Sequence, residues 1–134
     1  MLDMDLEKRV HSAIRQMVIE SVAESAHDLS DGGLAVALAE CCFYHSIGAS
    51  VDLDSNLRSE FLLFGEAPSR ILVSTTDPSR IQQIAAEHGA LAMVLGATID
   101  GRLVIRNRQT PLIDCDISSL RNTWATALEG MIRQ

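Results

Sequence analysis

The stretch His27-Asp-Leu-Ser-Asp-Gly-Gly-Leu-Ala-Val-Ala-Leu-Ala-Glu40 joins a polar, glycine-bearing turn to a segment with almost no polar face. Apolar side chains continue over Leu34–Ser46, which predicts a helix that is apolar all round and therefore buried. Asp31 is the expected N-cap of this helix, and Gly48 would end it. The stretch thus predicts a buried helix that is entered through a flexible turn.

Predicted helices and strands alternate along the rest of the sequence. Apolar residues recur every three or four positions between Asp5 and Glu24, which predicts a helix. Asp77-Pro78 marks another helix start, with Asp as N-cap and Pro at the first helical position, and Gly89 follows its end. An optional strand precedes the buried helix. Helices are also expected over 56–64 and after Asp116 or Ser118, and strands over 48–53, 70–75, 91–99, 103–106 and 112–115.

The order of these elements indicates the fold class. Asp100-Gly101 is typical of a two-residue hairpin turn, so the strands on its two sides are expected to pair. The other strands alternate with helices. We therefore predict an α/β fold with a mixed β-sheet packed with helices. No linker or repeat interrupts residues 1–134, which are expected to form a single domain.

Length and composition exclude several classes of protein. The chain has 134 residues, 47% apolar and 22% charged, which is enough apolar surface to fill a core and excludes a disordered chain. Its 11 Lys and Arg against 18 Asp and Glu give a net charge of -7, which argues against nucleic acid as a partner. No apolar run reaches the about 18–20 residues that cross a bilayer, so no membrane partner is expected.

The cysteines and the N-terminal sequence bear on the compartment. Cys41, Cys42 and Cys115 form no Cys-x-x-Cys pattern, which argues against a disulfide framework or a zinc site. Cys41 and Cys42 are expected to be small core residues. Met1–Val10 is acidic and lacks the apolar region of a signal peptide, so a cytoplasmic location is expected.

One polar cluster directly precedes the buried helix. Glycines let a backbone approach a ligand closely, and the N–H groups at a helix N-terminus attract anions. The two carboxylates would repel a bare phosphate, but a bridging Mg²⁺ would resolve this. In the alternative structural interpretation, the glycines form a turn while the acidic and histidine side chains satisfy nearby backbone groups. The cluster consists of His27, Asp28, Ser30, Asp31, Gly32 and Gly33.

A second cluster is Phe64-Gly-Glu-Ala-Pro-Ser-Arg70. Glu66, in a loop that enters a strand, could hold a ligand hydroxyl or an ammonium group. Alternatively, Gly65 ends a helix and Glu66 pairs with Arg70. Neither cluster has the spacing of a nucleophile and its base, and the nucleotide-binding glycine motifs are missing, so no catalytic residue is assigned.

Two further features carry weaker expectations. Arg102, Arg106 and Arg108 follow one another along a predicted hairpin, where a solvated face is expected and a phosphate-binding edge is the alternative. Trp124 is expected either in the core or at a domain interface.

The quoted motifs resemble the synthetase superfamily that includes aminoimidazole ribonucleotide synthetase. Within it, the chain looks most like the phosphoribosylformylglycinamidine synthase family, in the second of its two C-terminal-type domains. The His27–Glu40 motif carries this likeness, and Leu6–Val10, Leu63–Glu66 and Ser69–Ser74 continue it in the same order. The resemblance covers nearly the whole chain. It implies the α/β fold of the C-terminal domain of aminoimidazole ribonucleotide synthetase-like proteins.

The resemblance also implies an activity. The family makes formylglycinamidine ribonucleotide in purine biosynthesis, using ATP, Mg²⁺ and ammonia derived from glutamine. ATP activates the amide oxygen of formylglycinamide ribonucleotide as an iminophosphate, and ammonia displaces the phosphate. Asp28 is the expected contact to Mg²⁺. The residues that match the family's cleft motif are His27, Asp28, Asp31, Gly32 and Gly33, and those that match its second loop are Glu66 and Arg70.

The sequence departs from the full family pattern in two ways. The N-terminal-type nucleotide-binding domains and the glutaminase domain or subunit are expected partners that lie outside this chain. We therefore expect a domain excised from a longer enzyme, inactive alone, and a homodimer formed through its exposed interdomain face. Ala67 and Pro68 follow Glu66 where the family usually has serine, which fits a copy with a structural or auxiliary-nucleotide role. The alternative function is a small α/β metabolite-binding regulatory or scaffold module.

Overall fold

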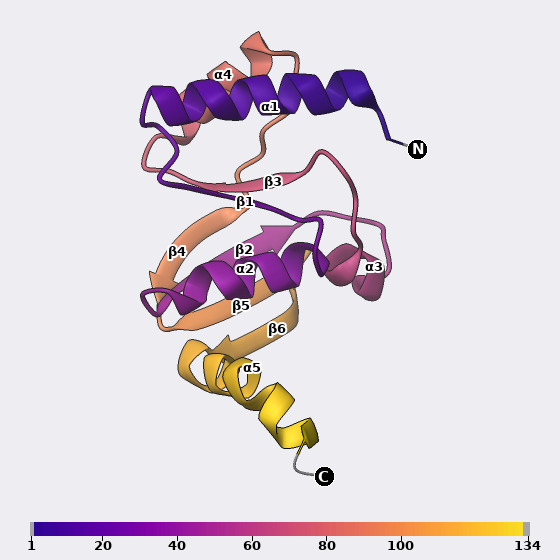
Figure 1. Cartoon of the computed structure of the whole chain (residues 1–134), viewed down its shortest axis with the longest axis vertical. Coiled ribbons are helices and arrows are strands. Elements are labelled where there is room, and N and C mark those ends of the chain that lie inside the picture. Colours follow the sequence, from indigo (N-terminus) through magenta and orange to yellow (C-terminus); the bar gives the residue numbers. More distant parts are fainter. Residues whose placement is uncertain (1, 133–134) are drawn as a thin grey trace. The chain divides into compact units, whose positions relative to one another are not determined.

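The computed structural model describes residues 2–132, without the side chain of residue 128. Helices and strands follow each other in the predicted order, and the optional strand before the buried helix is present (Figure 1). The chain divides into two compact units. One consists of residues up to 37 together with 65–94, and the other of 38–64 together with the chain from 95 onward. Helix α2 (Gly33–Phe43) contributes residues to both units.

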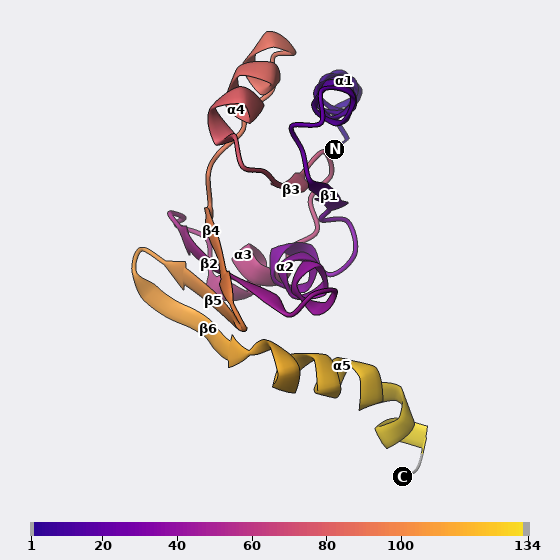
Figure 2. The same ribbon diagram turned by 90° about the vertical axis from the view of Figure 1, so that its left-hand side faces the viewer.

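The first unit packs two helices and a two-stranded antiparallel ribbon. In the ribbon, β1 (Ser25–Asp28) pairs with β3 (Ile71–Ser74). Helices α1 (Met4–Ile19) and α4 (Pro78–Glu87) lie side by side in both views (Figures 1 and 2). Their facing sides form a small core of buried residues, which are Ala13, Met17, Ile81, Ile84 and Ala85.

Local sequence signals explain where these helices begin and end. Asp77 caps α4 as predicted, because its carboxylate accepts the Arg80 N–H at 3.0 Å.

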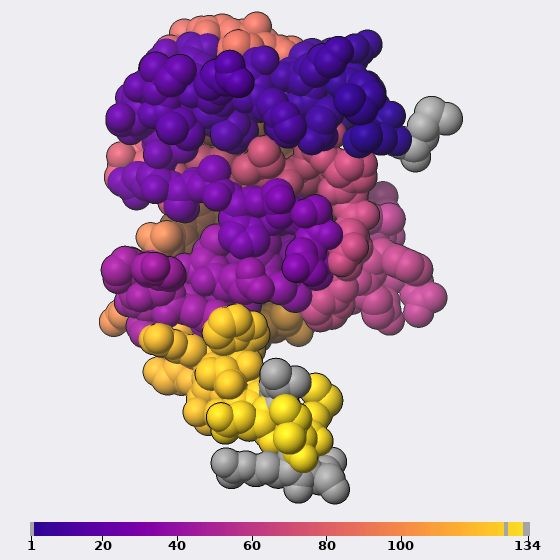
Figure 3. All heavy atoms as spheres, viewed as in Figure 1, coloured from indigo at the N-terminus to yellow at the C-terminus, as the bar shows by residue number. Residues whose placement is uncertain are grey.

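Helix α1 forms the continuous indigo surface of Figure 3. This helix ends at Ile19 and not at the predicted Glu24. The backbone turns into the left-handed region at Ser21 (φ 57°), which releases the chain toward β1.

The second unit contains a four-stranded sheet in the order β4-β2-β5-β6. The inner strand β2 (Ile47–Leu53) runs antiparallel to β4 (Gly96–Asp100) and parallel to β5 (Arg102–Asn107). The sheet is therefore mixed, which confirms the predicted fold class. The remaining elements are β6 (Thr110–Asp116), α3 (Ser59–Phe64) and α5 (Ile117–Ile132).

The predicted hairpin at Asp100-Gly101 is wrong. Strands β4 and β5 do not pair with each other, because β2 lies between them and bonds to both. This arrangement needs a glycine in β2: a Cβ on Gly48 would lie only 1.8 Å from the carbonyl oxygen of Arg102. The true hairpin joins β5 to β6 through Arg108 and Gln109, whose φ angles of 51° and 67° suit a type I′ turn.

Three smaller predictions also fail. The strand expected over 91–99 is limited to Gly96–Asp100, and the helix expected over 56–64 begins at Ser59. Cys42 is buried as expected, but Cys41 is exposed. Trp124 is 61% exposed, which excludes the core and leaves the domain interface of the two predicted alternatives. Within residues 2–132, no helix combines the length and hydropathy that crossing a bilayer requires.

Candidate functional site

The first predicted cluster forms the junction between β1 and α2. His27 and Asp28 end the strand, and the following residues form the turn into the helix. Gly32 and Gly33 have φ angles of 90° and 80°, a region that other residues rarely adopt. A Cβ on Gly32 would also lie 2.8 Å from the Cβ of Val36. This turn therefore depends on glycine for both its conformation and its packing.

Hydrogen bonds within the turn orient the Asp28 carboxylate. The Ser30 hydroxyl donates to Asp28 Oδ1 over 3.0 Å. His27 Nδ1 lies 2.6 Å from the carbonyl oxygen of Asp28, and it must carry the proton because a carbonyl can only accept. Asp28 itself is exposed. Its carboxylate is thus held in place by Ser30 and remains accessible from solvent.

The second cluster meets the first at the start of α2. Glu66 Oε1 accepts the N–H of Gly32 over 2.9 Å, although 34 positions separate the two residues. Gly32 directly precedes the first helical residue, so the Glu66 carboxylate lies at the positive end of the helix dipole. The sequence predicts Asp31 as the cap of this helix, but α2 begins at Gly33, so Asp31 lies one position too early.

The sequence left open whether Glu66 pairs with Arg70, but the Glu66 carboxylate contacts the Gly32 N–H instead. Within the described residues 2–132, Glu66 and Arg70 form no ion pair. Arg70 approaches the first cluster through its backbone, because its carbonyl accepts the Leu29 N–H at 3.2 Å. This bond extends the β1–β3 ladder by one step beyond Asp28 and Ile71. The two predicted clusters therefore form one site.

Two residues with no predicted role, Ser69 and Glu7, hold the second loop. Ser69 has a left-handed backbone (φ 63°), and its hydroxyl donates a hydrogen bond to the carboxylate of Glu7 on α1. The Ser69–Arg70 junction therefore has a fixed anchor on α1. No local pattern could reveal this pair, because 62 positions separate its members.

The acidic groups can be tested for their fit to a metal ion. In the described part of the chain, no three His, Cys, Asp or Glu side chains are close enough together to hold one. Mg²⁺, however, commonly binds to one or two carboxylates and completes its shell with water and phosphate oxygens. The exposed, oriented carboxylate of Asp28 fits that pattern. A metal ion at Asp28 would therefore need water and phosphate oxygens as its other ligands.

The three arginines near the hairpin are engaged within the second unit. Arg102 donates to Asp114 Oδ1 over 2.5 and 3.1 Å, and Arg108 donates to Asp54 over 2.6 Å. The pKa of Arg102 is raised, first by its hydrogen bond to Asp114 and then by that carboxylate's charge. Two of the three cations are thus neutralised, which supports the solvated face over a phosphate-binding edge.

The family model and the similar sequences point to the same protein family. A family model described as "AIR synthase related protein, C-terminal domain" matches residues 1–106. The chain is 36% identical over 129 residues to phosphoribosylformylglycinamidine synthase subunit PurL of Moorella thermoacetica. It is 39% identical over 145 residues to the same subunit of an Anaeromyxobacter species. These alignments cover 95% and 99% of this chain but only 18% of each relative.

Solved structures from Thermotoga maritima show the same fold. The PurLQS structure superposes with a TM-score of 0.80 and 26% identity, over 90% of this chain and 22% of that one. PurL complexed with ATP gives a TM-score of 0.76 at 26% identity, over 85% of this chain and 21% of that one. PurL complexed with FGAR gives 0.77 at 27% identity, over 86% and 21%.

Proposed function

Since the chain belongs to the family of AIR synthase related protein C-terminal domains, we propose that it works as such a domain of a phosphoribosylformylglycinamidine synthase. The parent enzyme would be an ATP-dependent C–N ligase of purine biosynthesis that forms formylglycinamidine ribonucleotide. One observation carries this proposal: PurL relatives align with 95% and 99% of the chain at 36% and 39% identity.

The residues at the β1–α2 junction have distinct proposed roles. Bound Mg-ATP would supply the phosphoryl group that activates the amide oxygen of formylglycinamide ribonucleotide. Asp28, oriented by Ser30, would hold the metal ion. Gly32 and Gly33 would let the backbone approach a phosphate without a Cβ in the way. His27, Asp31, Glu66 and Arg70 would supply further polar contacts to nucleotide or substrate.

The chain is proposed to need partners for turnover. It spans 18% of the length of the PurL relatives that it matches, which supports a role as one domain among several. N-terminal-type nucleotide-binding domains would complete its cleft, and a glutaminase domain or subunit would deliver ammonia. The chain alone would then be inactive, and the enzyme would work in the cytoplasm. Ala67 and Pro68 after Glu66 suggest a structural or auxiliary-nucleotide role of this copy as the alternative, in which Asp28→Ala would leave kcat/KM unchanged.

A chimeric enzyme tests the proposed function. The matching segment of the Moorella thermoacetica relative is replaced by this chain, and ATP-dependent formation of formylglycinamidine ribonucleotide is measured with added ammonia. We expect activity above background. In the same chimera Asp28→Ala should lower kcat/KM by about tenfold to a hundredfold, as the loss of a metal-holding contact does. Asp54→Ala removes an exposed carboxylate that is not one of the proposed site residues and should leave the rate unchanged.

A second measurement separates the alternative function. The isolated chain is titrated calorimetrically with Mg-ADP and with formylglycinamide ribonucleotide. A chimera that folds normally but is inactive would contradict the proposed function. Tight, saturable binding by the isolated chain together with that result would favour the small metabolite-binding module.

A further inference from the structure

Helix α5 carries an apolar seam of which the second unit covers only the first half. Apolar residues recur along this helix at alternating spacings of three and four, the heptad spacing by which two helices pack together. Ile117 is completely buried and Leu120 is half-buried, whereas the other three members are exposed. The seam consists of Ile117, Leu120, Trp124, Ala127 and Met131.

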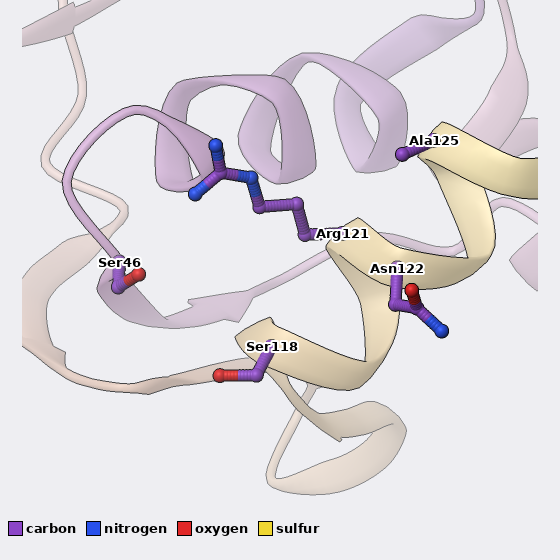
Figure 4. A pocket seen from close by; sticks show the side chains of 5 residues that line it. All are labelled: Ser46, Ser118, Arg121, Asn122 and Ala125. Atoms are coloured by element: carbon purple, nitrogen blue, oxygen red, sulfur yellow. The ribbon is translucent and has the colours of Figure 1, made fainter.

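The beginning of α5 is fixed to the rest of its unit. Asp116 caps the helix by accepting a backbone N–H of the first turn at 3.0 Å. The first turns lie beside the turn after α2, and Arg121 extends toward the segment that carries Ser46 (Figure 4). The rings of Phe43 and Trp124 have centroids 5.3 Å apart. Beyond Trp124 the helix extends away from the four-stranded sheet (Figure 2). The exposed half of the seam is thus held out on an anchored helix.

The exposed half of the seam has the composition of an interface. Trp124 and Met131 are 61% and 71% exposed, and their separation of seven residues places them on one side of the helix. Large apolar side chains that gather on one exposed side mark an interaction surface. Tryptophan is also one of the residues that contribute most to binding at the centre of an interface.

The charges of the chain favour a second copy as the partner. The net charge of -7 makes two copies repel each other over most of their surfaces. Between Ile117 and Ile132 the sequence has one cation, Arg121, and one anion, Glu129, so α5 is neutral. An antiparallel pair of these helices sets Arg121 of one copy level with Glu129 of the partner subunit. A parallel pair would set like charges level with each other, so charge favours the antiparallel arrangement.

We propose that α5 pairs with α5 of a second copy, antiparallel about a two-fold axis, an interaction that does not depend on the proposed function. With a positions facing d positions, Trp124 packs on Ala127 of the partner subunit, and Met131 packs on Leu120 of the partner subunit. Each large side chain then meets a smaller one, as close packing requires. The same residues serve both copies, so the contact closes as a dimer.

The size of this contact sets its strength. Pairing of about three helical turns on each side buries less than the roughly 1,200 Å² of a standard interface, so the dimer is weak. We expect a Kd between about 1 µM and 1 mM. Sedimentation equilibrium of the full chain across this concentration range should show the mass rise from one chain toward two. The fluorescence of Trp124, the single tryptophan, should shift to shorter wavelengths over the same range, because its ring leaves water.

Matched variants test whether the seam forms the contact. Met131→Glu introduces a charge into the seam and should raise the Kd at least tenfold. Asn122→Glu introduces the same charge on the opposite side of α5 and should leave the Kd unchanged. Trp124→Ala should also raise the Kd at least tenfold, and its circular dichroism should match that of the parent because this side chain is largely exposed.

Three results would overturn the proposal. One is the mass of a single chain at every concentration, which would leave the seam to another domain of the parent enzyme. Another is equal weakening by Met131→Glu and Asn122→Glu, which would reflect general repulsion between acidic chains. The third is a dimer that persists in both Met131→Glu and Trp124→Ala, which would place the contact on another surface.

Discussion

At the residue scale, Gly32 is the position where a single methyl group should do most damage. Its φ of 90° is unfavourable for any residue with a Cβ, and that atom would lie 2.8 Å from Val36 Cβ. Gly32→Ala should therefore lower the free energy of unfolding by about 2 kcal/mol or more. Chemical unfolding in urea measures this loss.

Gly130 provides the matched control. It lies in α5, and a Cβ there would meet nothing within 4 Å. Gly130→Ala should raise the free energy of unfolding by about 0.5–1 kcal/mol, because alanine favours a helix more than glycine does. A Gly32→Ala protein as stable as the parent would contradict the strained geometry of the turn.

Glu66 is the second residue with a measurable role. Its carboxylate caps α2 from a distant loop by accepting the Gly32 N–H. Glu66→Ala should cost about 1 kcal/mol of stability, the usual loss for a helix cap, and Glu66→Gln should cost less because the amide oxygen still accepts. Glu60→Ala, at an exposed acid on α3, should be nearly neutral. If the two alanine variants unfold at the same urea concentration, Glu66 is not a cap.

Cys42 gives the chain a stability that depends on alkaline pH. Burial raises the pKa of this thiol to about 11, and the neighbouring Cys41 and Cys115 add to the effect. The unfolded thiol loses its proton near its ordinary pKa of 9.0, so the folded state binds more protons between these values. Stability should therefore fall as the pH rises from about 9 to 11.

Alkylation and a variant check this behaviour. At pH 8 iodoacetamide should label the exposed Cys41 before the buried Cys42, as mass spectrometry of the peptides would show. Burial also raises the pKa of Cys41, so even this labelling should be slow. Cys42→Ala should flatten the fall in stability between pH 9 and 11. An unchanged slope would mean that groups other than Cys42 cause the fall in stability.

Residue types suggested the members of the candidate site, but their hydrogen-bond partners could not be inferred. Asp28, Gly32 and Gly33 stand out because acids and glycines before an apolar helix suggest a ligand-binding turn. The bond between Gly32 and Glu66 depends on the pairing of β1 with β3, which brings the two loops together. Cys41 was predicted to be a core residue but is exposed, because a helix that is apolar in composition still has one side facing solvent.

At the scale of elements, the pairing of α1 with α4 should respond to acid. Arg80 donates twice to Glu20, over 2.9 and 2.7 Å, and Gln16 donates to the same carboxylate over 2.8 Å. The hydrogen bond from Gln16, and then the one from Arg80, hold the pKa of Glu20 below its ordinary value of 4.5. This contribution is present above pH 4.5 and is lost as the pH falls through the lowered pKa.

Urea unfolding at several pH values tests the contribution of Glu20. The midpoint should decline between about pH 5 and 3, and the decline should be shallower in Glu20→Gln, which cannot lose this charge. Because the pair is exposed to solvent, added salt should also reduce the effect. An identical decline in both proteins would mean that other carboxylates cause it.

Most elements followed from local patterns, and the errors occurred where distant strands compete. Asp77-Pro78 fixed the start of α4 because the cap is a short-range contact. The strand order could not be inferred in the same way. Asp100-Gly101 has the composition of a hairpin turn, but β2, about 50 positions earlier, takes the place between the flanking strands. The sequence did not predict the turn at Arg108–Gln109, because neither residue is typical of a type I′ turn.

At the scale of the whole molecule, the sequence predicted a mixed sheet with helices, and the family match supports that class. It did not predict that the chain divides into two compact units, each built from two separate segments. Such interleaving depends on which strands pair over long sequence separations, and periodicity contains no information about that. Local sequence signals therefore predict the order of elements along the chain, but they do not predict the order of strands in the sheet.

The position of β2 between β4 and β5 also constrains how the chain can reach its native state. The β5–β6 hairpin needs only a two-residue loop, whereas β2 must close a loop of about 50 residues before it can insert, and long closures slow folding. Ile113→Ala, in the hairpin, should therefore slow refolding, with a φ-value well above that of Val51→Ala in β2, which should mainly speed unfolding. Stopped-flow chevrons of the two variants measure this, and the reverse ranking would mean that the inserted strand belongs to the folding nucleus.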